Sequence, residues 1–150
     1  MIDFNEHSHF IKPMHNEFSG RFNNLCSSEL GFVKERLKKI CLWTEEDAEE
    51  ARKDFLRFVS LTFVTTETIV PSKQVDEFWH NFILFTRPYV DWSESHWGRG
   101  VYLHHNPGHI PGKAWEHTQG MVLDIFGANW PHDAQAASCC SPPPPEPALN

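Results

Sequence analysis

The sequence predicts an all-α fold of about five helices in one compact domain, followed by a flexible tail. Three observations support this prediction. Apolar residues recur at the three- and four-residue spacing of amphipathic helices along most of the chain. Residues that favour helix ends, among them Thr44, Ser72 and Gly127, stand where these periodic segments begin or end. The hydrophobic content of 40% over 150 residues is sufficient for one core.

The first 27 residues show no sustained period, and we expect an irregular N-terminal arm whose aromatic rings cover the core. A first helix is predicted over residues 28–42. Its apolar residues at helical spacing are Leu30, Val33, Leu37 and Ile40. A second helix should begin after Thr44, because three acidic residues follow in the first turn, where unpaired NH groups favour negative charge. That helix should end near Thr66, within a β-branched run.

The third predicted helix follows Ser72, which can cap it, and has the clearest pattern of the chain. Its apolar residues fill the i, i+3, i+4, i+7 and i+8 positions, namely Val75, Phe78, Trp79, Phe82 and Ile83. Pro88 cannot donate to the helical hydrogen bonds. We therefore expect either a kink or a new helix that is capped by Thr86 and continues to about Trp97.

Glycine and proline then mark a loop over residues 98–112, in which a short β-ribbon at residues 98–105 would also fit. The last helix is predicted over residues 113–126. It should end at Gly127, because glycine adopts the left-handed conformation of a C-terminal cap at little cost.

The helical domain is expected to cover residues 1–132, and residues 133–150 should form a flexible tail. This tail is rich in proline and small residues, which bury too little apolar surface to fold. We interpret its Cys139 and Cys140 as mobile thiols. The PPPPEP segment and the tryptophan-rich helix also favour an alternative function. In that alternative the protein is an interaction module that binds a protein partner, and its histidines are purely structural.

Composition excludes several classes of function. The net charge of −7 argues against nucleic-acid binding, which normally uses a basic surface. No apolar run reaches the roughly 18 residues of a membrane span. The four cysteines match no zinc-finger spacing, and the polar start of the chain does not resemble a secretory signal. We therefore expect a cytoplasmic protein that binds neither nucleic acid nor membrane.

The ten histidines are the compositional outlier, and the residues best suited to chemistry lie between Asp76 and His109. Asp76 and His80 are four residues apart on one border of the third helix's apolar stripe, so their side chains are neighbours. The following loop adds His104, His105 and His109. Adjacent residues of an extended chain point to opposite sides, so only one of His104 and His105 is expected to join His80.

These residues predict a metal site formed by His80 and one of the two adjacent histidines, completed by Asp76, His109 or His96. Two histidines and one carboxylate suit zinc, iron, nickel or copper, and leave positions open for water or substrate. The same residues also fit a structural network in which the carboxylate only orients an imidazole. The sequence contains no nucleophile elbow and no phosphate-binding loop. Catalysis is therefore left open, with a metal-assisted hydrolytic or oxidative step as the natural class.

The segment from about residue 70 to 130 resembles proteins described as glycine-rich domain-containing protein-like, including small bacterial members. The shared features are an acid, an aromatic-Trp-His step, a Thr-Arg-x-Tyr step and an HHxP loop. In this chain they are Asp76, Trp79-His80, Thr86-Arg87, Tyr89 and His104-His105 before Pro107. The resemblance implies a helical architecture, and we take Trp79, Arg87 and Tyr89 as residues that support the site. Pro88 and Trp92 depart from the family's pattern.

Overall fold

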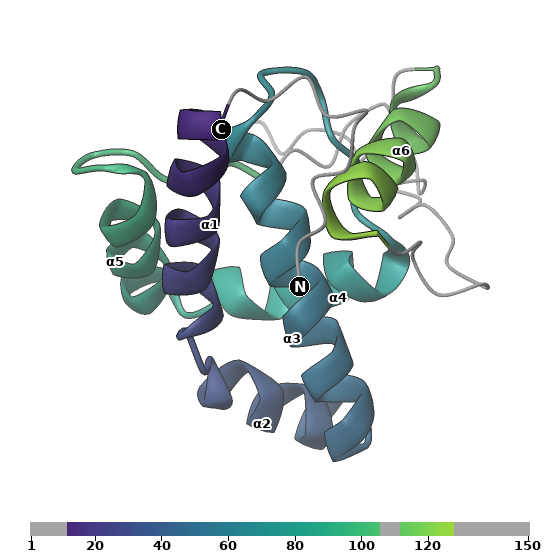
Figure 1. The fold of residues 1–150 in the computed structure, drawn as a ribbon. Coiled ribbons are helices and arrows are strands. Elements are labelled where there is room, and N and C mark those ends of the chain that lie inside the picture. Colours follow the sequence, from purple (N-terminus) through teal and green to yellow (C-terminus); the bar gives the residue numbers. More distant parts are fainter. Residues whose placement is uncertain (1–11, 106–111, 128–150) are drawn as a thin grey trace, which may run out of the picture.

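The computed structural model of the chain describes residues 12–105 and 112–127 (Figure 1). Over these ranges the fold consists of six α-helices, one short 3-10 helix and no strand, which confirms the all-α class. The helices are α1 (Lys12–Cys26), α2 (Gly31–Ile40), α3 (Glu45–Ser60), α4 (Lys73–Ile83), α5 (Thr86–Trp97) and α6 (Ala114–Phe126), with the 3-10 helix η1 at Leu61–Phe63. The tail at residues 133–150 lies outside the described ranges.

Helix α3 is the centre of the fold and packs against α1, α2 and α4 (Figure 1). It begins as predicted, because the backbone NH of Asp47 donates to Thr44 Oγ1 at 3.0 Å. Its inward face is apolar and buried, and Phe55 and Phe58 are among the largest fully buried side chains. Burial of rings of this size supplies much of the hydrophobic stabilisation of a domain this small.

Helices α4 and α5 are two separate helices, so Pro88 follows a new start and not a kink. The Ser72 cap of α4 is confirmed, since the backbone NH of Val75 donates to Ser72 Oγ at 3.2 Å. The predicted Thr86 cap is wrong. Phe85 occupies the cap position, and Thr86 is the first helical residue. Pro88 is tolerated because it lies in the first turn, where a backbone NH has no partner within the helix.

The expected irregular arm at residues 1–27 is wrong for most of its length, because α1 occupies Lys12–Cys26. With this extra helix, residues 12–105 and 112–127 contain six α-helices, where about five were predicted for the domain. Phe18, Phe22 and Leu25 stand at i, i+4 and i+7, but polar residues fill the rest of the segment and obscure this short stripe. Its stability comes from tertiary packing, for example the contacts of Phe18 and Phe22 with Phe126 of α6.

Helix α6 is joined to the rest of the fold by a hydrogen bond from the segment before α4. The backbone NH of Val70, in the segment before α4, donates to Thr118 Oγ1 in α6 at 2.9 Å, and this bond is buried. Gly127 ends α6 in the left-handed conformation, with φ of 68°, as predicted. None of the helices in the two described ranges is long and apolar enough to cross a membrane.

Candidate metal centre

Asp76 and His80 of α4 meet His105 of the loop that follows α5, and we call these three residues the candidate metal centre. One ligand atom from each lies within 4.8 Å of the others. His105 Nε2 is 2.5 Å from Asp76 Oδ1, and His80 Nδ1 is 3.5 Å from Asp76 Oδ2. The two imidazole rings have centroids 4.2 Å apart. One carboxylate therefore contacts two imidazoles that come from separate elements and are themselves in contact.

The local structure of α4 accounts for the first half of this arrangement. Residues 76 and 80 are one helical turn apart, so their side chains lie above one another on the same face. Asp76 is also in the first turn, where the unpaired NH groups of the helix favour a carboxylate. Its side chain is only 14% exposed, whereas that of His80 is 48% exposed. An ion could therefore reach the centre from the His80 side.

The position of His105, the third residue of the centre, depends on a chain of hydrogen bonds beneath its loop. Trp79 Nε1 donates to Tyr89 Oη at 2.8 Å, and Tyr89 Oη donates to the backbone oxygen of Leu103 at 2.7 Å. Burial raises the pKa of Tyr89 to about 12. The phenol therefore stays protonated and able to donate to Leu103 at physiological pH. Trp79 and Tyr89, both predicted as supporting residues, thus tie the loop to α4 and α5.

The two adjacent histidines of the loop point in different directions. His105 is 8% exposed and packs edge-on against Trp79, with ring centroids 4.6 Å apart. His104 is exposed and lies beside the ring of Tyr102, at 4.8 Å. Exposure alternates along this segment, since Tyr102 and His104 are exposed whereas Leu103 and His105 are partly buried. Of the predicted pair, His105 is the member that the structure brings to Asp76 and His80.

Two of the other predicted residues, His96 and Arg87, lie elsewhere. His109 is outside the described residues. His96, at the end of α5, is 3.5 Å from Ser28 Oγ, and both burial and nearby Arg21 lower its pKa. Arg87 is exposed in the first turn of α5, and the centre does not include it.

Sequence reasoning missed the role of Leu103, whose backbone oxygen holds the loop. The signal was present in the chain, because an apolar residue two positions before His105 favours the same, inward side for both.

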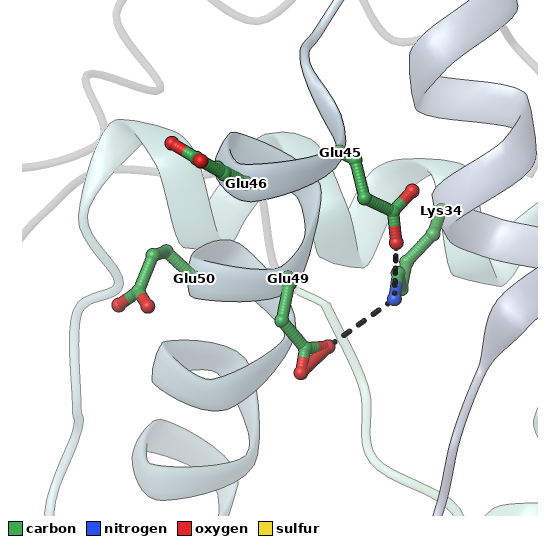
Figure 2. A pocket seen from close by; sticks show the side chains of 5 residues that line it. All are labelled: Lys34, Glu45, Glu46, Glu49 and Glu50. Atoms are coloured by element: carbon green, nitrogen blue, oxygen red, sulfur yellow. Dashed lines mark hydrogen bonds and ion pairs between the residues drawn. The ribbon is translucent and has the colours of Figure 1, made fainter.

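A second group of ionisable side chains lies where α2 meets the start of α3. This charged cluster consists of Lys34, Glu45, Glu46, Glu49 and Glu50. Lys34 Nζ is 3.1 Å from Glu45 and 3.3 Å from Glu49, whereas Glu46 and Glu50 point away from the ammonium group (Figure 2). Its carboxylates are paired mainly with lysine and arginine, so the cluster is a network of ion pairs at the surface.

A family match covers both clusters. The UCP032817-like family model matches residues 20–126. The chain belongs to this family. All three residues of the candidate metal centre lie within the matched region, and the proline-rich tail lies outside it. The family's description names no activity, and neither a curated protein nor a solved structure matched the chain. A functional conclusion for this UCP032817-like protein therefore depends on the geometry of its site.

Proposed function

We propose that this protein binds one divalent transition-metal ion through Asp76, His80 and His105. The observation that carries the proposal is the convergence of two imidazoles and one carboxylate within 4.8 Å, from a helix and a loop 29 residues apart. Local helix geometry brings Asp76 and His80 together in any case. This group differs from ordinary pairs on a helix surface because it has a third ligand, His105, whose ring packs against Trp79.

The ligand types define the class of ion. Two nitrogens and one oxygen suit zinc, iron(II), nickel or copper. Metal bonds to these atoms are about 2.0–2.2 Å long, so two ligands of one ion lie at most roughly 4 Å apart. Small side-chain rotations would close the present arrangement around an ion, and the exposed His80 is the side chain with most freedom to move.

Three protein ligands leave coordination positions open beside His80, where solvent has access. An ion held in this way can polarise a bound water or a substrate oxygen, which is the basis of metal-assisted hydrolysis, and an iron or copper ion would extend this to oxidative steps. We therefore propose metal-assisted chemistry as the activity that such a centre would support. The Asp76 carboxylate would lose its hydrogen bond to His105 and gain a bond to the metal.

Metal analysis of protein purified without a histidine tag tests this proposal. We expect close to one equivalent of metal, or saturable binding of added zinc, that raises the melting temperature. His80→Ala and His105→Ala should each abolish stoichiometric binding. His104→Ala is the matched control, because it removes the neighbouring, outward-facing imidazole and should leave binding unchanged. Wild-type protein that neither carries nor takes up zinc, iron, nickel or copper would refute the proposal.

The alternative of an interaction module has less structural support from the aromatic residues. Trp79 and Trp92 are buried and serve the core, so neither presents an aromatic surface to a partner. A protein partner for residues 133–150 stays a prediction, since that tail is outside the described residues. The cytoplasmic location and the resemblance to glycine-rich domain-containing protein-like proteins also stay predictions, because the family match does not address them.

A further inference from the structure

The loop from Val101 to His105 presents two chemically identical imidazoles, and only one of them reaches Asp76. Ligand chemistry cannot make that choice, because His104 and His105 offer the same nitrogen atoms. In an extended segment the choice follows from which side each residue faces. Leu103 packs against the core and His105 is sheltered, whereas His104 is exposed on the other side. One restraint on residue 103 therefore decides the orientation of its neighbours.

The chain of hydrogen bonds from Trp79 through Tyr89 supplies such a restraint. The Tyr89 hydroxyl accepts from Trp79 Nε1, which leaves its proton directed to the Leu103 oxygen. Trp79 is also the ring on which His105 packs, and it immediately precedes His80 in α4. The restraint on the loop and the wall of the candidate metal centre are thus parts of one buried unit.

We propose that Tyr89 is a positioning residue that selects His105, and not His104, as the loop ligand of the metal centre. This inference rests on the proposed metal site. Without the hydroxyl, the loop keeps both imidazoles but loses the bond that holds its backbone in register. His104 and His105 then compete for Asp76, and the affinity for metal falls because part of the population is misoriented.

Tyr89→Phe is the direct test, since it keeps the buried ring and removes only the hydroxyl. We expect about a tenfold weaker affinity for zinc, the scale on which outer hydrogen-bond partners of metal ligands act. The visible spectrum of bound cobalt(II) should change as well. Adding His104→Ala, which is neutral in the wild type, should restore part of the lost affinity in the Tyr89→Phe background, because it removes the competing imidazole. Such a non-additive double-variant result measures competition between the two imidazoles.

Tyr102→Phe is the matched control, because it removes the hydroxyl of the chain's other tyrosine from an exposed ring of the same loop. It should leave zinc affinity and the cobalt spectrum unchanged. Leu103→Ala is a second control. It retains the backbone oxygen that accepts from Tyr89, so adding His104→Ala to it should not change zinc affinity. If Tyr89→Phe binds zinc as tightly as wild type, with an identical cobalt spectrum and no effect of His104→Ala, selection by Tyr89 is overturned.

Proton NMR of the metal-free protein separates this inference from the metal proposal. In wild type, ring-to-ring contacts between His105 and Trp79 are expected, and Tyr89→Phe should weaken them and add contacts from His104. If the wild type binds no metal, the proposed function fails while this measurement still decides the positioning of His105. Should Tyr89→Phe not fold, the wild-type Tyr89 hydroxyl proton provides the test. Slow exchange with solvent supports the anchor, and rapid exchange overturns it.

Discussion

The candidate metal centre and the charged cluster of α2 and α3 both place carboxylates against nitrogen-bearing side chains, yet only the first is suited to a metal ion. In the charged cluster, Lys34 lies between Glu45 and Glu49 at the surface (Figure 2). In the candidate metal centre, Asp76 contacts two imidazoles and is 14% exposed. The two regions differ in the chemistry of the partner and in the depth of the carboxylate.

The partner decides what else a carboxylate can bind. A lysine ammonium has no free electron pair at neutral pH, so it neutralises a carboxylate without offering a ligand of its own. A neutral imidazole has one free electron pair and can coordinate an ion in place of a hydrogen bond. The number of acids in a cluster is therefore a poor guide to metal binding. The charged cluster has four carboxylates and the candidate metal centre only one.

The largest expected difference between the two regions is in metal affinity. Asp76→Asn removes the only anionic ligand of the proposed site. Loss of a residue that only hydrogen-bonds to a metal ligand lowers affinity by up to about 100-fold, so we expect this direct loss to lower zinc affinity by at least about 100-fold. Glu49→Gln, which makes the same chemical change in the charged cluster, should leave zinc affinity unchanged. Isothermal titration of both variants measures the difference. Equal losses in the two variants would mean that zinc binds by general attraction to negative charge.

A smaller difference is expected in the stability of the metal-free protein. His105→Ala removes a sheltered ring that packs on Trp79 and leaves Asp76 without its closest partner. We expect the free energy of unfolding to fall by about 2 kcal/mol. Lys34→Met should cost under about 1 kcal/mol, because Glu49 retains Arg52 as a partner at the surface. Urea unfolding in the presence of a chelator measures both values.

His104→Ala is the control for that comparison, since the exposed neighbouring ring should contribute within about 0.5 kcal/mol. If His105→Ala costs no more than His104→Ala, the imidazole is not anchored in the metal-free protein, and the depth of the candidate metal centre would not distinguish it from the charged cluster.

The same contrast explains what the sequence could predict. Helical spacing and caps such as Thr44, Ser72 and Gly127 are local signals, and they located five of the six α-helices in the part of the chain that the structure describes. Asp76 and His80 were paired by helix geometry alone. For His105 over His104 the only local signal was the apolar Leu103 two positions earlier, and the hydrogen bond from Tyr89 to Leu103 joins separate elements that no local pattern relates.

Helix α1 was missed for a related reason. Its apolar stripe is short, and its stability depends on contacts with η1 and α6 that are remote in the sequence. Local periodicity therefore predicts helices that carry a broad apolar face. It does not predict a helix whose short apolar stripe is held by contacts with remote elements, α3 among them.

The smallest expected effect is the pH dependence of the stability that Glu49 contributes in the charged cluster. The hydrogen bond from Arg52, together with the nearby Lys34, lowers the pKa of Glu49 from 4.5 to about 2. A carboxyl group whose pKa is lowered by folding stabilises the protein above its unfolded pKa, and this contribution is lost as the pH falls towards the folded pKa.

Wild type should therefore exceed Glu49→Gln in stability by under about 1 kcal/mol at neutral pH, because the pair is near the surface. The difference should shrink as the pH falls from 4.5 towards 2, as measured by urea unfolding. Glu46→Gln, whose side chain points away from Lys34, is the matched control for the loss of one surface carboxylate (Figure 2). A Glu49→Gln difference that stays constant on acidification would show that packing, and not charge pairing, distinguishes this residue.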